Sequence, residues 1–378
     1  MNRYLTGLTA ALALTVAGTG AANAAAGWTR DPMPLPAGMT HGLPAGVSCQ
    51  AAGICMAVGT GRRNALVWYW NGRAWALRHS PVPAGAQSTG LSAVSCPSAL
   101  ECLAVGGQAT ASAPDGVPLA ERWDGSRWHA QSTPNPAGTF LSALDAVSCD
   151  SPNSCTAVGT ADGSGEQTLA EHWDGTNWTI QPIPTPPNPL QLTFDGVSCP
   201  SAARCLAVGY TGSRPFAESW NGSTWTLQSV PVPVGGTNGE LRGVSCPSVT
   251  GCIAVGSYVN SASRAVPLAE HWNGSAWTPR SVPLPADSAR GGALTAISCA
   301  PTVTCAAVGT LSRTSVTAQA LAEVWNGTTW SLRQTATPVS HKIFLAVSCT
   351  AARTCAAVGD DTTDGGARRL ALPLAEHE

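Results

Sequence analysis

The sequence predicts an all-β protein, a seven-bladed β-propeller with four-stranded antiparallel blades. Three observations support this fold class. The 14 cysteines fall into seven C-x5-C pairs, and successive first cysteines lie 47 to 53 residues apart, a repeat length typical of propeller blades. Most of the 14 tryptophans recur beside the same short turn in each repeat. The 40 glycines and 29 prolines interrupt the chain too often for long helices.

Composition limits what the chain can do. Of 378 residues, 44% are hydrophobic and 11% are charged, which leaves enough apolar material for a core and excludes wholesale disorder. The net charge is −2, and Lys342 is the single lysine among 20 basic residues. We therefore do not expect a nucleic-acid backbone as the partner.

The first 24 residues have the features of a secretory signal peptide. Arg3 precedes an apolar run from about residue 5 to 17, and Ala22-Asn23-Ala24 matches an A-x-A cleavage site. The run is too short to span a bilayer, and no later stretch reaches the ~18 uninterrupted apolar residues of a membrane helix. We expect residues 1–24 to be removed, and residues 25–378 to form one secreted, extracellular propeller domain without a membrane span.

The cysteines of an exported chain, in even number and at regular spacing, are expected to pair as disulfides. Zinc ligation fits poorly because the pairs have no companion histidine or further cysteine, and a redox role lacks a C-x-x-C motif. The expected pairs, one in each repeat, are Cys49–Cys55, Cys96–Cys102, Cys149–Cys155, Cys199–Cys205, Cys246–Cys252, Cys299–Cys305 and Cys349–Cys355.

Each repeat is expected to supply four strands, with blades beginning near residues 44, 91, 144, 194, 241, 294 and 344. The first two strands are the V-S-C and C-x-A-V-G stretches, joined inside the disulfide. The third strand resembles residues 119–123, and an Asn-Gly or Asp-Gly turn, a strong hairpin signal, leads to the fourth. The tryptophans of W-[ND]-G-x-x-W then share one face. We expect them to pack against the neighbouring blade; the alternative is a sugar-stacking platform.

The two ends of the chain are expected to complete one blade together. The last repeat stops after its third strand, at Glu378, with no following turn. Trp28 precedes Cys49 by 21 residues, the same distance that separates Trp75 from Cys96. Residues 25–37 are therefore predicted to supply the outer strand of the last blade, which closes the ring and removes a free sheet edge.

The repeats resemble kelch-type propeller repeats in all seven units. The resemblance rests on the glycine pair of Ala104-Val-Gly-Gly107, on the turn from Trp123-Asp124-Gly125 to Trp128, and on fourth strands that end in proline. It implies the propeller fold and says little about activity. The W-D pairs lack the Gly-His element of WD-type repeats.

A glutamate recurs two residues before the third-strand tryptophan. Alternation places it on the face of that tryptophan, so it should be at least partly buried, with the serine of V-S-C or nearby backbone N–H groups as partners. The alternative is a Glu–Trp pair that lines a sugar pocket between blades, similar to fucose-binding propeller lectins, although no arginine recurs at a fixed place. Trp68 replaces this glutamate in the first blade and is a ligand-binding candidate. The glutamates are Glu121, Glu171, Glu218, Glu270, Glu323 and Glu376.

One face of the propeller is expected to carry recognition. The first-to-second and third-to-fourth turns are uniform and share one face, whereas the second-to-third loops and the connections between blades vary on the other. The distance from the A-V-G glycine to the third-strand tryptophan ranges from 11 to 17 residues. Divergent loops on a rigid scaffold usually bind ligands. The candidates are Arg62, Arg63, Asp115, Asp162, Glu166, Arg214, Tyr258, Arg264, Arg313, Asp360, Asp361, Asp364, Arg368 and Arg369.

Catalysis and cofactors are not expected. No G-x-S-x-G, H-E-x-x-H or nucleotide-binding loop occurs. Copper oxidases of kelch type use Tyr and His ligands, which are few and dispersed here. The Asp360-Asp361-x-x-Asp364-Gly365 stretch is weakly similar to a calcium loop, but a solvated acidic turn explains it better.

The sequence thus predicts a secreted, non-catalytic recognition module without metal or cofactor. Its expected ligand is a cell-surface glycan or an extracellular protein, bound around the central channel on the variable-loop face. Two alternatives remain: a protein-interaction scaffold or recognition subunit of a secreted assembly, and a polysaccharide hydrolase or lyase.

Overall fold

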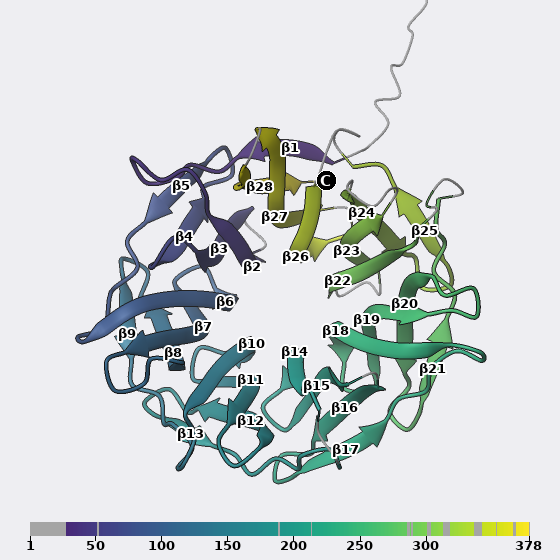
Figure 1. Cartoon of the computed structure of the whole chain (residues 1–378), viewed down its shortest axis with the longest axis horizontal. Coiled ribbons are helices and arrows are strands. Elements are labelled where there is room, and N and C mark those ends of the chain that lie inside the picture. Colours follow the sequence, from purple (N-terminus) through teal and green to yellow (C-terminus); the bar gives the residue numbers. More distant parts are fainter. Residues whose placement is uncertain are drawn as a thin grey trace, which may run out of the picture.

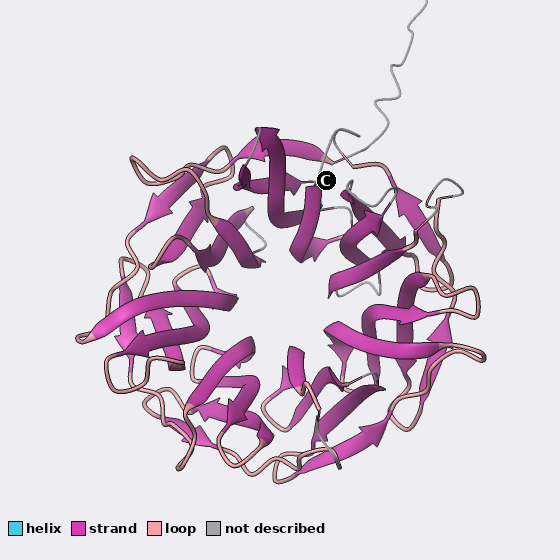
Figure 2. Cartoon of the chain, viewed as in Figure 1, coloured by secondary structure: helices cyan, strands magenta, loops and turns pink. Residues whose placement is uncertain are grey.

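The computed structural model describes residues 28–50, 53–187, 190–212, 214–285, 288, 290–300, 304–312, 318–335, 342–352, 354–365 and 368–377, with the backbone alone for 342 and 362–377. Within these residues, 28 strands form seven four-stranded antiparallel sheets, arranged as a ring (Figure 1). The predicted seven-bladed propeller is confirmed. Strands make up the regular structure (Figure 2), and in this described part no helix is long and apolar enough to cross a membrane.

Within each blade the strands follow one another from the centre of the ring to its rim. The inner strands of blades 1 to 7 are β2 (Leu43–Gln50), β6 (Ala86–Ser98), β10 (Leu141–Ser151), β14 (Thr193–Ser201), β18 (Thr237–Ser248), β22 (Gly292–Cys299) and β26 (Lys342–Ala351). The second strands are β3 (Ile54–Thr60), β7 (Glu101–Thr110), β11 (Ser154–Asp162), β15 (Arg204–Thr211), β19 (Gly251–Val259), β23 (Cys305–Ser312) and β27 (Thr354–Gly365).

The third and fourth strands complete each blade. The third strands are β4 (Ala65–Trp70), β8 (Val117–Trp123), β12 (Glu166–Trp173), β16 (Arg214–Trp220), β20 (Ala265–Trp272), β24 (Ala318–Trp325) and β28 (Arg368–His377). The outer strands are β5 (Trp75–Arg78), β9 (Trp128–Gln131), β13 (Trp178–Ile180), β17 (Trp225–Ser229), β21 (Trp277–Arg280), β25 (Trp330–Arg333) and, in blade 7, β1 (Thr29–Pro32).

The ring closes through its two ends, as predicted. Strand β1 pairs antiparallel with β28, from Thr29 opposite His377 to Pro32 opposite Leu374. Trp28, 3% exposed, lies against Phe344 of the inner strand with 5.9 Å between ring centroids. The first described residues therefore pack into the last blade and cover an edge of β28 that would otherwise be open.

All seven predicted disulfides form, and a serine beside each one joins neighbouring blades. The two cysteines of a pair lie on β-strands at a Cα–Cα distance of 3.9 to 4.1 Å. The serine that precedes each first cysteine accepts a hydrogen bond from the backbone N–H of the first cysteine in the next blade. The seven bonds measure 2.9 to 3.0 Å, and Ser348 of blade 7 bonds Cys49 of blade 1. These seven hydrogen bonds, which we call the serine stitch, thus link neighbouring blades around the whole ring.

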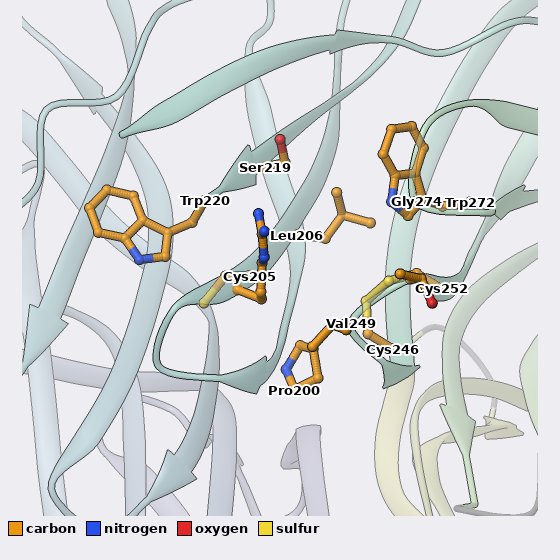
Figure 3. Close-up of a pocket in the computed structure, with 12 residues that line it drawn as sticks. Pro200, Cys205, Leu206, Ser219, Trp220, Cys246, Val249, Cys252, Trp272 and Gly274 are labelled. Carbon is orange, nitrogen blue, oxygen red and sulfur yellow. A yellow bond between two sulfur atoms is a disulfide. The ribbon is translucent and has the colours of Figure 1, made fainter. Parts of the chain in front are cut away.

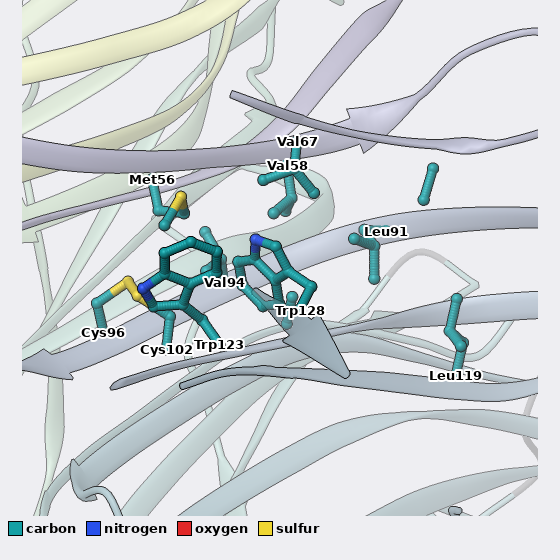
Figure 4. Close-up of a cluster of buried hydrophobic side chains, with 12 residues drawn as sticks. Met56, Val58, Val67, Leu91, Val94, Cys96, Cys102, Leu119, Trp123 and Trp128 are labelled. Atoms are coloured by element: carbon teal, nitrogen blue, oxygen red, sulfur yellow. A yellow bond between two sulfur atoms is a disulfide. The ribbon is translucent and has the colours of Figure 1, made fainter. Parts of the chain in front are cut away.

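The paired tryptophans pack between blades, as expected. Trp123 and Trp128 lie directly opposite each other on β8 and β9, with ring centroids 5.9 Å apart. Figure 4 shows the Trp123 ring beside the Cys96–Cys102 disulfide and close to Met56 of blade 1, with the Trp128 ring next to Trp123 on the side away from the disulfide. The tryptophan that begins the outer strand in each of blades 1 to 6 is at most 8% exposed. These outer-strand rings are part of the hydrophobic core and are not open platforms for sugars, whereas Trp70, Trp220 and Trp272 of the third strands are only partly buried.

Asparagine and aspartate shape the turn between third and fourth strands. In blade 1, the Asn71 side-chain oxygen accepts hydrogen bonds from the backbone N–H groups of Arg73 and Ala74, both at 2.9 Å. Gly72 follows with a φ of 87°, a conformation that glycine adopts without steric cost. The same arrangement recurs around Asp124, Asp174, Asn221, Asn273 and Asn326.

Candidate functional site at the channel

Every inner strand contains a β-bulge four residues before its first cysteine, and the bulged residue lines the central channel. The register shifts there in all seven blades, and these residues surround a cavity of about 210 Å³. Bulges re-aim side chains and are common next to functional sites. We call this set the channel ring: Ala45, Ser92, Asp145, Asp195, Arg242, Thr295 and Leu345.

The A-V-G glycine makes each bulge possible. A Cβ atom on Gly209 would lie 1.9 Å from the carbonyl oxygen of Thr193, two residues before bulged Asp195. The equivalent glycine of each other blade meets the same obstacle at 2.0 to 2.1 Å. Glycine is therefore required at this position by the close approach of the inner strand.

Charge is concentrated on one side of the channel ring. Arg242 contacts Asp195 at 3.2 Å and Glu240 at 2.8 Å, and its guanidinium lies 5.2 Å from the ring centroid of Tyr210. The Ser257 hydroxyl also donates to Glu240, at 2.7 Å. Three carboxylates and one guanidinium, counting Asp145, thus meet where blades 3, 4 and 5 face the channel.

Burial changes the proton affinity of the two aspartates. Desolvation raises the pKa of Asp145 to about 7, and the neighbouring charge of Asp195 adds to this increase. Desolvation also raises the pKa of Asp195 to about 6, although the positive charge of Arg242 opposes that increase. Asp145 therefore holds its proton to a higher pH than Asp195 does.

The cluster lies toward the variable-loop face. Tyr210 is near the end of β15, just before the loop that leads to β16, and Glu240 pairs with Ser257 near the corresponding end of blade 5. Sequence reasoning missed Asp145, Asp195, Glu240, Arg242 and Tyr210. The residue four positions before each first cysteine differs between repeats, and this variation was visible in the sequence. The direction of its side chain depends on a β-bulge, which the sequence pattern does not reveal.

The predicted loop residues differ in their surroundings. Arg62 and Arg63 are exposed on one loop, Asp115 is exposed on another, and Arg214 is exposed at the start of β16, whereas Asp162 and Tyr258 are partly buried.

Others have structural partners: Glu166 accepts from the Leu192 backbone N–H at 2.7 Å, and Arg264 donates to the Ser288 carbonyl. Arg313 lies outside the described residues, as do the side chains of Asp364, Arg368 and Arg369.

The interpretation of residues 360–364 as a solvated acidic turn is wrong. They belong to strand β27, and Asp360 and Asp361 are at most 9% exposed. Asp361 forms an ion pair with Arg30 of β1 at 2.8 Å, so it contributes to ring closure. Among the side chains that are described, no three of His, Cys, Asp and Glu gather as metal ligands.

The recurrent glutamates are fully buried between blades. Five are 0% exposed; the side chain of Glu376 is not described. The expectation that the V-S-C serine partners them is wrong, because that serine bonds the next blade. Glu121 accepts from Ser80 at 2.8 Å, and the other four carboxyl groups have no hydrogen-bond partner among the described residues.

Trp68 occupies the glutamate position in blade 1, and its indole N–H is hydrogen bonded. Its side chain is 0% exposed, packs with Met33 and Val358 between blades 7 and 1, and its indole N–H donates to the Pro34 carbonyl at 2.7 Å. The irregular tryptophan therefore lies in the core beneath the N-terminal segment, without access for a ligand.

Comparison with known proteins identifies the fold. The sequence matches no protein-family model and no curated protein. Similar solved structures include YCF48 bound to D1 peptide (TM-score 0.56, 13% identity, 93% of this chain and 96% of that chain). They also include the polysaccharide lyase PL25 ulvan lyase bound to its saccharide (0.56, 9%, 89% and 94%) and the SapL1 lectin in complex with alpha methyl fucoside (0.50, 14%, 80% and 99%). At these identities the similarity shows a propeller and no function.

Proposed function

We propose that this protein is a secreted recognition module that binds a glycan at the channel mouth on the variable-loop face. The observation that carries the proposal is the charged side of the channel ring, Asp145, Asp195 and Arg242, with Glu240 and Tyr210 beside it. The rest of the ring presents small or apolar groups. A concave site with a few convergent polar groups is the usual form of a ligand site.

The chemistry of these side chains complements a sugar. Carboxylates accept hydrogen bonds from hydroxyl groups, and a guanidinium donates several in one plane. Arg242 is already held by Asp195, Glu240 and Tyr210, so little conformational entropy is lost when it binds a ligand. The similarity to a fucoside-bound lectin supports a glycan ligand.

Seven disulfides support an extracellular location. Disulfides persist in oxidising compartments, and in this chain every cysteine is paired. The expected signal peptide lies outside the described residues, so secretion itself stays a prediction.

A glycan array tests the proposal directly. Wild-type protein should bind a defined set of glycans, and Asp145→Asn and Arg242→Gln should each weaken that binding by about tenfold or more, as expected when a charged hydrogen bond is lost. Asp150→Asn, an exposed aspartate beside a disulfide turn, is the matched control and should bind normally. Normal binding by both channel variants would place the ligand elsewhere. An array without signal, with a protein that co-purifies, would favour the scaffold alternative.

Glycan cleavage is the second candidate, and the aspartate pair favours it. Asp145 and Asp195, with pKa values of about 7 and about 6, are suited to donate and accept a proton near neutral pH. The similarity to a polysaccharide lyase supports the same idea. Incubation of the bound glycan with the protein distinguishes the two functions: new reducing ends or unsaturated products, abolished in Asp145→Asn, would identify an enzyme.

A further inference from the structure

A second cavity opens between blades 4 and 5, at the end of the blades that carries the disulfide turns. It encloses about 200 Å³, less than the ~300–1,000 Å³ of sites for drug-sized ligands, so it suits a single ring. Trp220 and Trp272 flank it on opposite sides, above Pro200 and Val249 (Figure 3). The Trp220 indole N–H donates to the Ala202 carbonyl at 3.2 Å, which fixes that ring in place.

The cavity exists because of one small side chain. The residue between the recurrent glutamate and the tryptophan faces the next blade, and in blade 4 it is Ser219. In blade 2 the same place holds Arg122, and only about 10 Å³ remains there. In blade 5 it holds His271, whose ring lies edge-on against Trp325 with centroids 4.5 Å apart. Val324 of blade 6 likewise leaves about 10 Å³.

The charges around the cavity also differ from those at the same place in blade 2. In blade 2, Glu101 stands just before the second cysteine and forms an ion pair with Arg122 at 2.7 Å. In blade 4, Arg204 occupies the position of Glu101, lines the cavity and is exposed. Ser219 occupies the position of Arg122. No acidic side chain lies within ion-pair distance of Arg204 among the described residues. The cavity therefore combines open space with a positive charge that lacks a counter-ion.

We propose that this cavity binds a saccharide unit that bears a carboxylate, such as a uronic acid. Arg204 would hold the carboxylate, because a guanidinium matches its two oxygens. The indole of Trp272, which packs between blades 4 and 5, offers apolar surface to a sugar ring, whereas the indole of Trp220 packs toward blade 3. Ser219, whose oxygen accepts from Gln228 at 3.1 Å, and Thr250 offer hydroxyl groups to the sugar. This site is independent of the channel and lies toward the opposite face, so one chain would contact a glycan at two places.

Titration calorimetry with simple sugars tests this site on the full chain. The probes are glucuronate and galacturonate, each compared with glucose or galactose. Wild type should bind a uronate about tenfold or more tightly than its neutral counterpart, and Arg204→Gln should remove that preference. The double variant R204E/S219R recreates the Glu101–Arg122 pair of blade 2, fills the cavity, and should abolish binding of the uronate.

Two controls separate this site from other causes. Arg73→Gln, an exposed arginine on the third-to-fourth turn of blade 1, should bind like wild type, which excludes an effect of net charge. Asp145→Asn, which alters the channel instead, distinguishes the two sites: a uronate preference that is lost in Asp145→Asn and kept in Arg204→Gln would assign the sugar to the channel and overturn this proposal. The proposal also fails if wild type does not distinguish uronates from neutral sugars, or if R204E/S219R binds as wild type does.

Discussion

The buried glutamates make the stability of the molecule depend on pH. Burial raises the pKa of Glu171, Glu218, Glu270 and Glu323 to about 8, and that of Glu121 to about 7, from an ordinary 4.5. In the folded protein these carboxyl groups therefore stay protonated at a pH where the unfolded chain has ionised them. The resulting stabilisation is complete below about pH 4.5 and is lost as the pH rises toward 8.

Replacing one such glutamate by its neutral isostere should reduce this pH dependence. Glu270→Gln should melt several degrees higher than wild type at pH 9, because the amide does not ionise. At pH 5 the two proteins should melt at similar temperatures, which is the internal control. Thermal melts followed by circular dichroism across pH 5 to 9 measure the difference. Melting curves that shift in parallel with pH would contradict the assigned protonation state.

The serine stitch is a second feature at the scale of the residue. Ser198 accepts from the Cys246 N–H at 3.0 Å, and Cys246 is 8% exposed. Ser198→Ala leaves that N–H without a partner, so it should reduce the free energy of unfolding by about 1–3 kcal/mol. Ser223→Ala, which removes a hydroxyl from an exposed turn, should cost far less. Urea denaturation compares them, and equal losses would show that the stitch contributes nothing.

At the scale of the strands, β1 closes the ring by pairing with β28. A chain that lacks residues 25–37 loses the pairing of β1 with β28, the burial of Trp28 and the carbonyl that accepts from Trp68. Truncation of one buried aromatic side chain alone costs about 3–5 kcal/mol, so this variant should melt far below a chain that begins at residue 25. Differential scanning calorimetry provides the comparison, and an unchanged melting temperature would refute the role of β1 in closure.

The hairpins were predictable because their causes are local. A cysteine pair six residues apart and an Asn-Gly turn each define their hairpin without reference to the rest of the chain, and the 21-residue distance from Trp28 to Cys49 located the closing strand. The bulges were not predictable, because they arise where an inner strand twists toward the channel against a glycine of the second strand. The direction of Asp145, Asp195 and Arg242 depends on those bulges. The candidate site was therefore missed although the face that carries it was expected to bind the ligand.

The cavity between blades 4 and 5 illustrates the opposite case. Aligning the seven repeats shows Ser219 where other blades have larger side chains, and Arg204 where blade 2 has Glu101. That difference becomes a site only when two blades are placed face to face, since the serine of one blade opens space against Trp272 of the next. Departures from a repeat thus gain meaning from the interface in which they lie.

For the molecule as a whole, the disulfides are local supports and the serine stitch is the connection between them. Each disulfide closes a loop within one blade, and a loop of this size is worth about 2 kcal/mol in the chain-entropy model. The first cysteine of each blade also donates its N–H to the serine of the preceding blade. The disulfides of neighbouring blades are therefore linked by one of these hydrogen bonds, whereas those of distant blades are not.

This arrangement predicts which double variants should be additive. Replacing both cysteines of a pair by serine in blades 1 and 4 (Cys49/Cys55 and Cys199/Cys205) should lower the free energy of unfolding by the sum of the two single effects, because the sites share no partner. Blades 4 and 5 (Cys199/Cys205 and Cys246/Cys252) should depart from additivity, because Ser198 precedes one disulfide and bonds the first cysteine of the other. A complete set of denaturation curves measures both couplings. If neighbouring and distant blades showed equal coupling, the serine hydrogen bonds would not contribute to the cooperativity of unfolding. That cooperativity would then come from the apolar contacts between blades alone.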